Sequence, residues 1–150
     1  MAPSMALIFP WTVHIVNELS NNKVLHVHCK SADNDLGVHT LKPKAEFKFS
    51  FWENPWGTTL FWCTLSTDRQ SRASFDVFWS SLWLSKGTKR NKYTDLEKVT
   101  KNEKILWIAR NDGIYLRETN FKPESLNRID PNEEDIIVED VLFHKWERKK

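Results

Sequence analysis

Two cysteines, Cys29 and Cys63, are the side chains of this sequence with the most evident covalent chemistry. Each lies in an apolar segment expected to form a strand. In an oxidising compartment they would form an inter-strand disulfide, which the chain-entropy estimate values at about 3–4 kcal/mol for a loop of this length. In a reducing compartment both would be ordinary buried thiols. The residues alone leave both states open.

Five histidines raise the question of a metal site. His26 and His28 are two residues apart and would share one face of a strand. A zinc site needs three or four converging ligands, and the spacing fixes no third one. We therefore expect no metal and no other cofactor.

Catalytic motifs are not found in the sequence. It contains no Gly-x-Ser-x-Gly, no His-Glu-x-x-His and no glycine-rich phosphate loop. Its acidic pairs fall in expected turns or near the C-terminus, where carboxylates are solvated. The sequence predicts a protein that is not an enzyme.

Eight tryptophans in 150 residues are the unusual part of the composition. Exposed indole rings stack on sugars, and together with lysine or arginine they stack on single-stranded nucleic acid. Most tryptophans of small β domains lie in the core instead. The candidates for exposure are Trp52, Trp56, Trp79 and Trp83. A carbohydrate-binding role stays open, whereas a nucleic-acid partner is not expected.

Charge is distributed unevenly although the net charge is only +2. Residues 86–104 carry seven basic side chains and three acidic ones, and residues 130–140 carry six acidic side chains and no basic one. The chain therefore has a basic loop and an acidic C-terminal region. This is compatible with a charged partner or mutual contact, but solvated loops are the stronger explanation.

Alternation of apolar and polar residues predicts short strands throughout the chain. Phe47, Phe49 and Phe51 share one face of the clearest amphipathic segment. Residues 58–65 form a nearly continuous apolar run typical of a central, buried strand. The expected strands cover residues 12–16, 24–29, 46–52, 58–65, 74–79, 105–110 and 113–117.

These elements predict an all-β fold, an antiparallel β-sandwich of about seven strands in a single domain. We expect an N-terminal leader or remnant over residues 1–11, the sandwich over 12–120 and a charged C-terminal extension over 121–150. No apolar run approaches the roughly 18 residues of a membrane span, so no membrane insertion is expected. A monomer is expected.

Several spaced motifs carry a resemblance to a known family. They are Leu25-His26-Val27-His28-Cys29, Asp33-Asn34-Asp35-Leu36-Gly37, Gly57-Thr58-Thr59-Leu60-Phe61-Trp62-Cys63, Ser74-Phe75-Asp76-Val77-Phe78 and Trp107-Ile108-Ala109-Arg110-Asn111-Asp112-Gly113-Ile114-Tyr115-Leu116. In order and spacing these motifs resemble the plant self-incompatibility protein family, the S-protein homologues. The resemblance extends over about residues 12–116.

The resemblance implies a small secreted β-sandwich that acts as an extracellular signalling ligand. Founding members are stigma proteins that bind a membrane protein of pollen. Family members usually carry four cysteines, and two are missing here at residues 100–104. Joint loss of one bonded pair implies that Cys29 and Cys63 form the remaining disulfide.

A ligand of this type would use loops presented by a rigid sandwich to contact a cell-surface membrane protein receptor. The alternative is an extracellular carbohydrate-binding module that uses exposed tryptophans. A coplanar exposed row of tryptophans would favour sugars, and buried tryptophans with an uneven loop surface would favour a protein. The residues expected to contact the partner lie in three loops: Asp33, Asn34, Asp35, Asn54, Trp56, Lys86, Lys89, Arg90 and Lys92.

Overall fold

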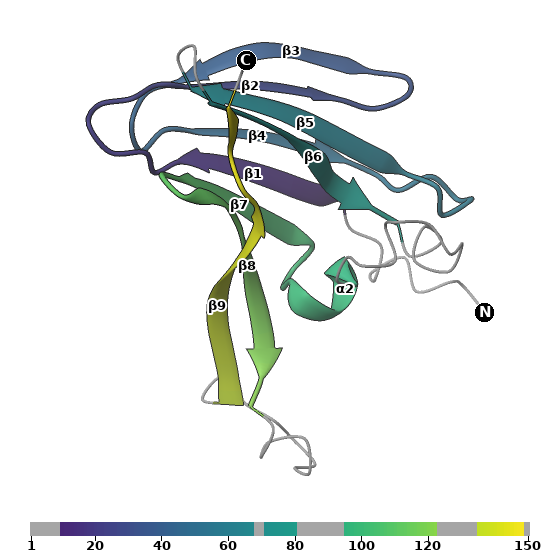
Figure 1. Ribbon diagram of the computed structural model, residues 1–150. Helices are drawn as coiled ribbons and strands as arrows, with labels where there is room; N and C mark the ends of the chain where they lie inside the picture. The colour runs from purple at the N-terminus through teal and green to yellow at the C-terminus, as the bar shows by residue number, and fades with distance from the viewer. Residues whose placement is uncertain (1–9, 68–70, 81–94, 123–134, 149–150) are drawn as a thin grey trace, which may run out of the picture.

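The computed structural model describes residues 10–67, 71–80, 95–122 and 135–148, which form two five-stranded sheets (Figure 1). Sheet A has the spatial order β4-β1-β7-β8-β9, and sheet B has the order β10-β6-β5-β2-β3. The strands are β1 (Trp11–Asn17), β2 (Leu25–Lys30), β3 (Asp35–Leu41), β4 (Glu46–Phe51), β5 (Leu60–Thr67), β6 (Ser71–Trp79), β7 (Lys104–Arg110), β8 (Gly113–Phe121), β9 (Ile136–His144) and β10 (Glu147–Arg148). The predicted all-β sandwich is confirmed.

Side-chain alternation along the strands produces the core between the sheets. In β1 and β5, every second residue is buried and its neighbours are half-buried, which is the period of a sheet with one face against a core. The continuous apolar run of residues 58–65 predicted a strand buried on both faces. β5 is indeed central in sheet B, but only one of its faces is buried, so Trp62 points outward.

Aromatic side chains fill one end of the core. Phe49 and Phe51 of β4 lie 5.1 and 4.4 Å, centroid to centroid, from Phe61 of β5. The fully buried Trp107 of β7 donates its indole N–H to the carbonyl of Val77 in the opposite sheet at 3.0 Å. Buried tryptophan N–H groups need such a partner, so this bond fixes the two sheets relative to each other.

One strand pair departs from the antiparallel pattern expected from the sequence. β1 runs parallel to β7, with Thr12 opposite Lys104 and Asn17 opposite Ala109. The other strand pairs within the two sheets are antiparallel. Parallel neighbours need a long connection, and here the chain forms β2 to β6 before it returns to β1.

The C-terminal strands join the two sheets. β9 pairs with β8 in sheet A, and two residues later β10 pairs with β6 in sheet B. Between them, Trp146 donates its indole N–H to the carbonyl of Arg110 at 2.7 Å. We call residues 144–148 the C-terminal strap. The division into a domain over 12–120 and an extension over 121–150 stays a prediction; β9 and β10 come from the range assigned to the extension.

Besides β9 and β10, two further described elements are absent from the strands expected from the sequence. β3 begins at Asp35, in a stretch predicted to be loop. The sequence hid this strand because Asp35 and Gly37 are turn-forming residues, Gly37 has a left-handed φ of +80°, and most of the strand is exposed. Helix α2 (Leu96–Val99) lies in the predicted basic loop; Asp95 caps it and its Leu96 and Val99 are buried. Within the described residues, no helix has the length and apolar character needed to cross a membrane.

Candidate functional site

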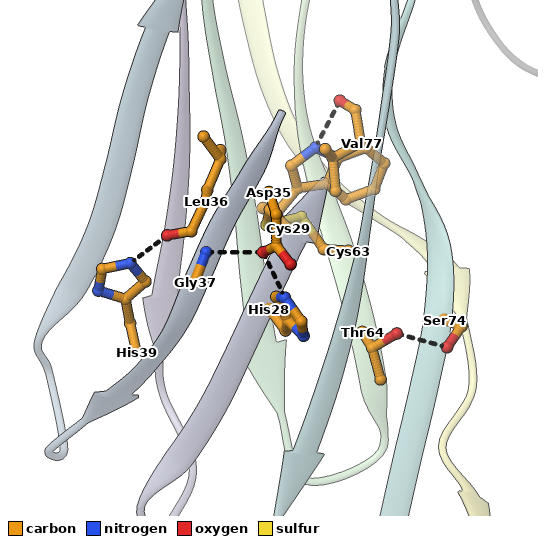
Figure 2. Close-up of a disulfide and its surroundings, with 11 residues drawn as sticks. His28, Cys29, Asp35, Leu36, Gly37, His39, Cys63, Thr64, Ser74 and Val77 are labelled. Atoms are coloured by element: carbon orange, nitrogen blue, oxygen red, sulfur yellow. Dashed lines mark hydrogen bonds and ion pairs between the residues drawn. A yellow bond between two sulfur atoms is a disulfide. The ribbon is translucent and has the colours of Figure 1, made fainter. Parts of the chain in front are cut away.

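The disulfide between Cys29 and Cys63 lies within sheet B, where the two residues are directly opposite each other on β2 and β5 (Figure 2). Their Cα atoms are 4.0 Å apart and both side chains are fully buried. The predicted pairing is confirmed. Because the bond sits one residue before the loop that follows β2, it holds the base of that loop.

That loop, residues 31–34, is closed by its own hydrogen bonds. Ser31 N–H donates to the carbonyl of Asn34 at 2.8 Å, and Asn34 N–H donates to the Ser31 hydroxyl at 3.2 Å. Asp33 and Asn34 are exposed at its tip. The loop therefore presents a carboxylate and an amide from a fixed backbone.

The neighbouring turn between β4 and β5 is also fixed. The Asn54 side chain accepts from Thr58 N–H at 2.9 Å, and Asn54 N–H donates to the Thr59 hydroxyl at 2.8 Å. Gly57 has φ +72°, a left-handed conformation that a β-carbon would disfavour. Local polar bonds thus hold the turn in one shape.

A second anchor ties this turn to the body of the sandwich. The Glu53 carboxylate accepts from the indole N–H of Trp11 at 2.7 Å and from the Ser80 hydroxyl at 2.8 Å. Glu53 is half-buried, and its neighbour Trp52 is 60% exposed. Trp56, at the tip of the turn, is 75% exposed. Rigid, exposed aromatic side chains of this kind contact partners at low entropic cost.

The two loops enclose one cleft at the end of the sandwich. Its volume is about 480 Å³, and Asp33, Asn34, Trp52, Asn54 and Trp62 are among its lining residues. We call it the end cleft. Two of the three loops predicted to contact a partner are therefore adjacent.

Asp35, another predicted contact residue, is not among the residues that line the end cleft. Asp35 lies on β3, where its carboxylate accepts from the backbone N–H of Gly37 and pairs with His28 at 2.6 Å (Figure 2). These bonds, the Gly37 bond first, hold the pKa of Asp35 below its usual value. Asp35 therefore links the start of β3 to β2 in sheet B. The predicted contacts of the basic loop, Lys86, Lys89, Arg90 and Lys92, lie outside the described residues.

The described tryptophans differ in burial and in whether the indole N–H has an acceptor. Trp11, Trp107 and Trp146 donate their indole N–H groups to protein acceptors. Trp52, Trp56 and Trp62 are bonded to no acceptor within the described part of the chain. Trp79 of the predicted candidates is buried at 2% exposure, and Trp83 lies outside the described residues. The exposed Trp52 and Trp56 lie in the turn that joins β4 of sheet A to β5 of sheet B.

Trp62 lines the end cleft but was not among the candidates from the sequence, because it lies in an apolar run typical of a buried strand. The sequence did contain a signal for its outward position. Phe61, Cys63 and Leu65 alternate strictly with Trp62 and Thr64, so the second set lies on the opposite face of the strand. Within the described residues, no three side chains of the metal-ligating types gather in one place. The arrangement offers aromatic faces, hydroxyls, amides and fixed charges, which are the components of a recognition surface.

These features define a class: small, disulfide-bonded β-sandwich proteins with fixed, exposed loops beside a cleft. Residues 12–128 match the family model described as "Plant self-incompatibility protein S1". The chain belongs to the plant self-incompatibility protein family, the S-protein homologues.

Three relatives from Arabidopsis thaliana illustrate the match. S-protein homolog 74 is 34% identical over 93% of this chain and 73% of the relative. S-protein homolog 1 is 31% identical over 93% of this chain and 74% of the relative. S-protein homolog 21 is 36% identical over 71% of this chain and 73% of the relative.

A solved structure shares the fold. It belongs to an SPH protein described as one of "a widespread family of small, highly stable, secreted proteins from plants". The similarity covers 96% of this chain and 99% of that chain, with a TM-score of 0.54 and 18% identity. At this identity the likeness concerns the fold.

Proposed function

We propose that this protein is a secreted, non-catalytic ligand that a membrane protein at the surface of plant cells recognises. Membership of a family described as secreted supports the extracellular location. A buried disulfide supports it as well, since such bonds persist in oxidising compartments.

The observation that carries the proposal is the uneven loop surface around the end cleft, where a rigid turn exposes Trp52 and Trp56. Trp52 and Trp56 project from a turn fixed by Asn54 and Glu53, beside the acidic tip of loop 31–34. Tryptophans on such surfaces are common hot spots of protein–protein interfaces. A pre-formed turn keeps the ordering cost of binding low.

The test is saturable binding of the labelled full chain to plasma-membrane vesicles from the source plant. Trp56→Ala is expected to weaken binding roughly thirtyfold, the equivalent of about 2 kcal/mol for a hot-spot residue. Val138→Ala, an exposed apolar residue on β9 in the other sheet, is the matched control and should bind as the wild type.

Protease treatment of the vesicles identifies the kind of partner. Loss of binding after digestion is expected for a protein receptor. Binding that survives digestion, or a Trp56→Ala variant with unchanged affinity, would contradict the proposal.

The basic loop has its own test in the same assay. Reversal of Lys89, Arg90 and Lys92 to glutamate is expected to weaken binding to the vesicles and to leave retention on polysaccharide intact. The opposite result would remove the basic loop from the proposed interface.

A further inference from the structure

The outward face of sheet B carries a second hollow, of about 380 Å³, along β2 and β5. We call it the sheet-face groove. Its residues include Lys30, His28 and His26 on β2, Trp62 and Ser66 on β5, and Arg72 on β6. Trp62 lines both this groove and the end cleft, so the two hollows meet at that side chain.

Strand pairing orders the side chains of the groove. Lys30 lies opposite Trp62, His28 opposite Thr64 and His26 opposite Ser66. Ser66 in turn lies opposite Arg72. The groove therefore runs along the strands, from a lysine and a tryptophan at one end to an arginine at the other.

The half-buried Trp62 provides an aromatic surface on this face. In the part of the chain that the structure describes, its indole N–H has no acceptor, unlike that of the core residue Trp107. An indole on a polar face offers a ring for stacking and a free donor. Sugar rings, with apolar C–H faces and hydroxyl rims, fit both properties.

Polar side chains continue along the groove floor. The Thr64 hydroxyl is 3.0 Å from that of Ser74, and Nδ1 of His26 is 3.0 Å from the Thr40 hydroxyl (Figure 2 shows Thr64, Ser74 and His28). Each hydroxyl makes one of these bonds and retains further donor or acceptor capacity. Because they stand on paired strands, these groups are already in place for a ligand.

Two basic side chains mark the two ends of the groove. Lys30 and Arg72 lie at opposite ends, four residues apart along β5, which corresponds to about 13 Å. No carboxylate lines the groove among the described residues. Three carboxylates stand beside it: Asp35 is 3.9 Å from Lys30, Asp76 is the cross-strand neighbour of Trp62, and Glu147 is that of Arg72.

We propose that the sheet-face groove binds a linear acidic glycan, a chain of uronic-acid residues. One sugar ring stacks on Trp62, and carboxylates further along the chain pair with Lys30 and Arg72. The spaced cations match the repeating negative charge of such a polymer. An extended acidic peptide has similar charge, but the groove offers Val27 and Val38 as its only aliphatic lining among the described residues, and Val38 is 66% exposed. This assignment goes beyond the receptor proposal, since it concerns another surface and another ligand.

The experiment is titration calorimetry of the full, oxidised chain with an oligogalacturonide. The fully methyl-esterified oligomer, a neutral cello-oligosaccharide and a polyglutamate of equal length are the comparison ligands. The oligogalacturonide is expected to bind at least tenfold more tightly than each of them. Equal binding of the esterified or neutral glycan would overturn the acidic assignment, and equal binding of polyglutamate would overturn the glycan assignment.

Four variants locate the site. Trp62→Ala and Arg72→Gln are each expected to weaken binding about tenfold. Trp56→Ala, on the turn, and Lys48→Gln, on the outer face of sheet A, are the matched controls and should leave affinity unchanged. If Lys48→Gln costs as much as Arg72→Gln, the binding is unspecific attraction of a polyanion and the proposal fails.

A fifth variant tests the charge argument through an expected increase in affinity. Glu147→Gln removes the carboxylate next to Arg72 and is expected to tighten oligogalacturonide binding about threefold. Unchanged or weaker binding would contradict the assigned role of Arg72. The exposed positions of Arg72 and Glu147 keep these variants informative even if Trp62→Ala fails to fold. Trp56→Ala separates the two proposals, since only receptor binding depends on it.

Discussion

Asp140 of β9 accepts hydrogen bonds from two arginines, Arg110 and Arg117, at 2.8–3.1 Å. The bond from Arg117 is the largest influence that holds the pKa of Asp140 below its ordinary value. Arg110 also bonds Glu18 at 3.1 Å, which links β7, β9 and the segment after β1. The cluster therefore couples the charge of one carboxylate to the stability of sheet A.

Asp140→Asn is expected to lower the free energy of unfolding at pH 7 by about 1 kcal/mol, a modest value because the arginines are partly exposed. A depressed folded pKa contributes stability above the unfolded pKa, and that stability is lost as the pH falls through the folded pKa. Urea unfolding at neutral and acid pH should therefore show a smaller acid loss for Asp140→Asn. Glu139→Gln is the control, and an unchanged acid loss in Asp140→Asn would refute the argument.

The disulfide is the second feature with a residue-scale consequence. Replacing both Cys29 and Cys63 by alanine is expected to lower the free energy of unfolding by about 3–4 kcal/mol, from loop closure over 34 residues. Urea unfolding of oxidised wild type against the double variant measures this. Reduced wild type serves as the control and should unfold near the double variant. Equal stability of the oxidised and variant proteins would show that sheet B does not depend on the bond.

The C-terminal strap is the element that connects both sheets at their edges. His144 bonds the carbonyl of Ser74 in sheet B at 3.0 Å, and Trp146 bonds that of Arg110 in sheet A. Trp146 also packs against the core. Loss of the Trp146 side chain therefore removes both the hydrogen bond to sheet A and packing against the core between the sheets.

Trp146→Ala is expected to lower the free energy of unfolding by about 2 kcal/mol, less than for a fully buried tryptophan because Trp146 is half-buried. Thermal and urea unfolding measure the effect. Trp56→Ala, on the exposed turn, should leave stability unchanged. A Trp146→Ala variant as stable as wild type would show that the contacts of Trp146 do not contribute to the free energy of unfolding.

Sequence alone predicted the elements whose alternation is strict. The Phe47, Phe49 and Phe51 stripe and the alternating segments around Val13 and Val27 fall on strands, because period-two burial is a local signal. β3 was missed because turn-forming residues, Asp35 and Gly37, occupy a strand that is mostly exposed. Strand order, including the parallel pair β1–β7, depends on contacts far apart in the chain.

The candidate site was predictable to a similar extent. Turn chemistry around Asn54 and Asn34 identified two loops, but their meeting in one cleft follows from the pairing of β2 with β5. Trp62 was hidden in an apolar run, because composition cannot tell which face of a central strand is covered. The position of Cys63 shows which face is covered: its side chain is buried, so the adjacent Trp62 points to the opposite, outward face.

At the scale of the whole molecule, recognition features concentrate on sheet B. The end cleft and the sheet-face groove meet at Trp62. In sheet A, β8 and β9 extend beyond the other strands (Figure 1). The two surfaces proposed above as binding sites are therefore adjacent.

The parallel pairing of β1 with β7 also imposes an order of assembly on the nascent chain. Sheet B gains its hairpins β2–β3 and β5–β6 from neighbouring segments. Four of its strands can therefore pair once residue 79 has been made, and only β10 joins later. One edge of β1 can pair with β4 early, but the other edge has no partner until residues 104–110 emerge. An open strand edge is a template for aggregation. This edge of β1 thus needs protection until residues 104–110 have been made.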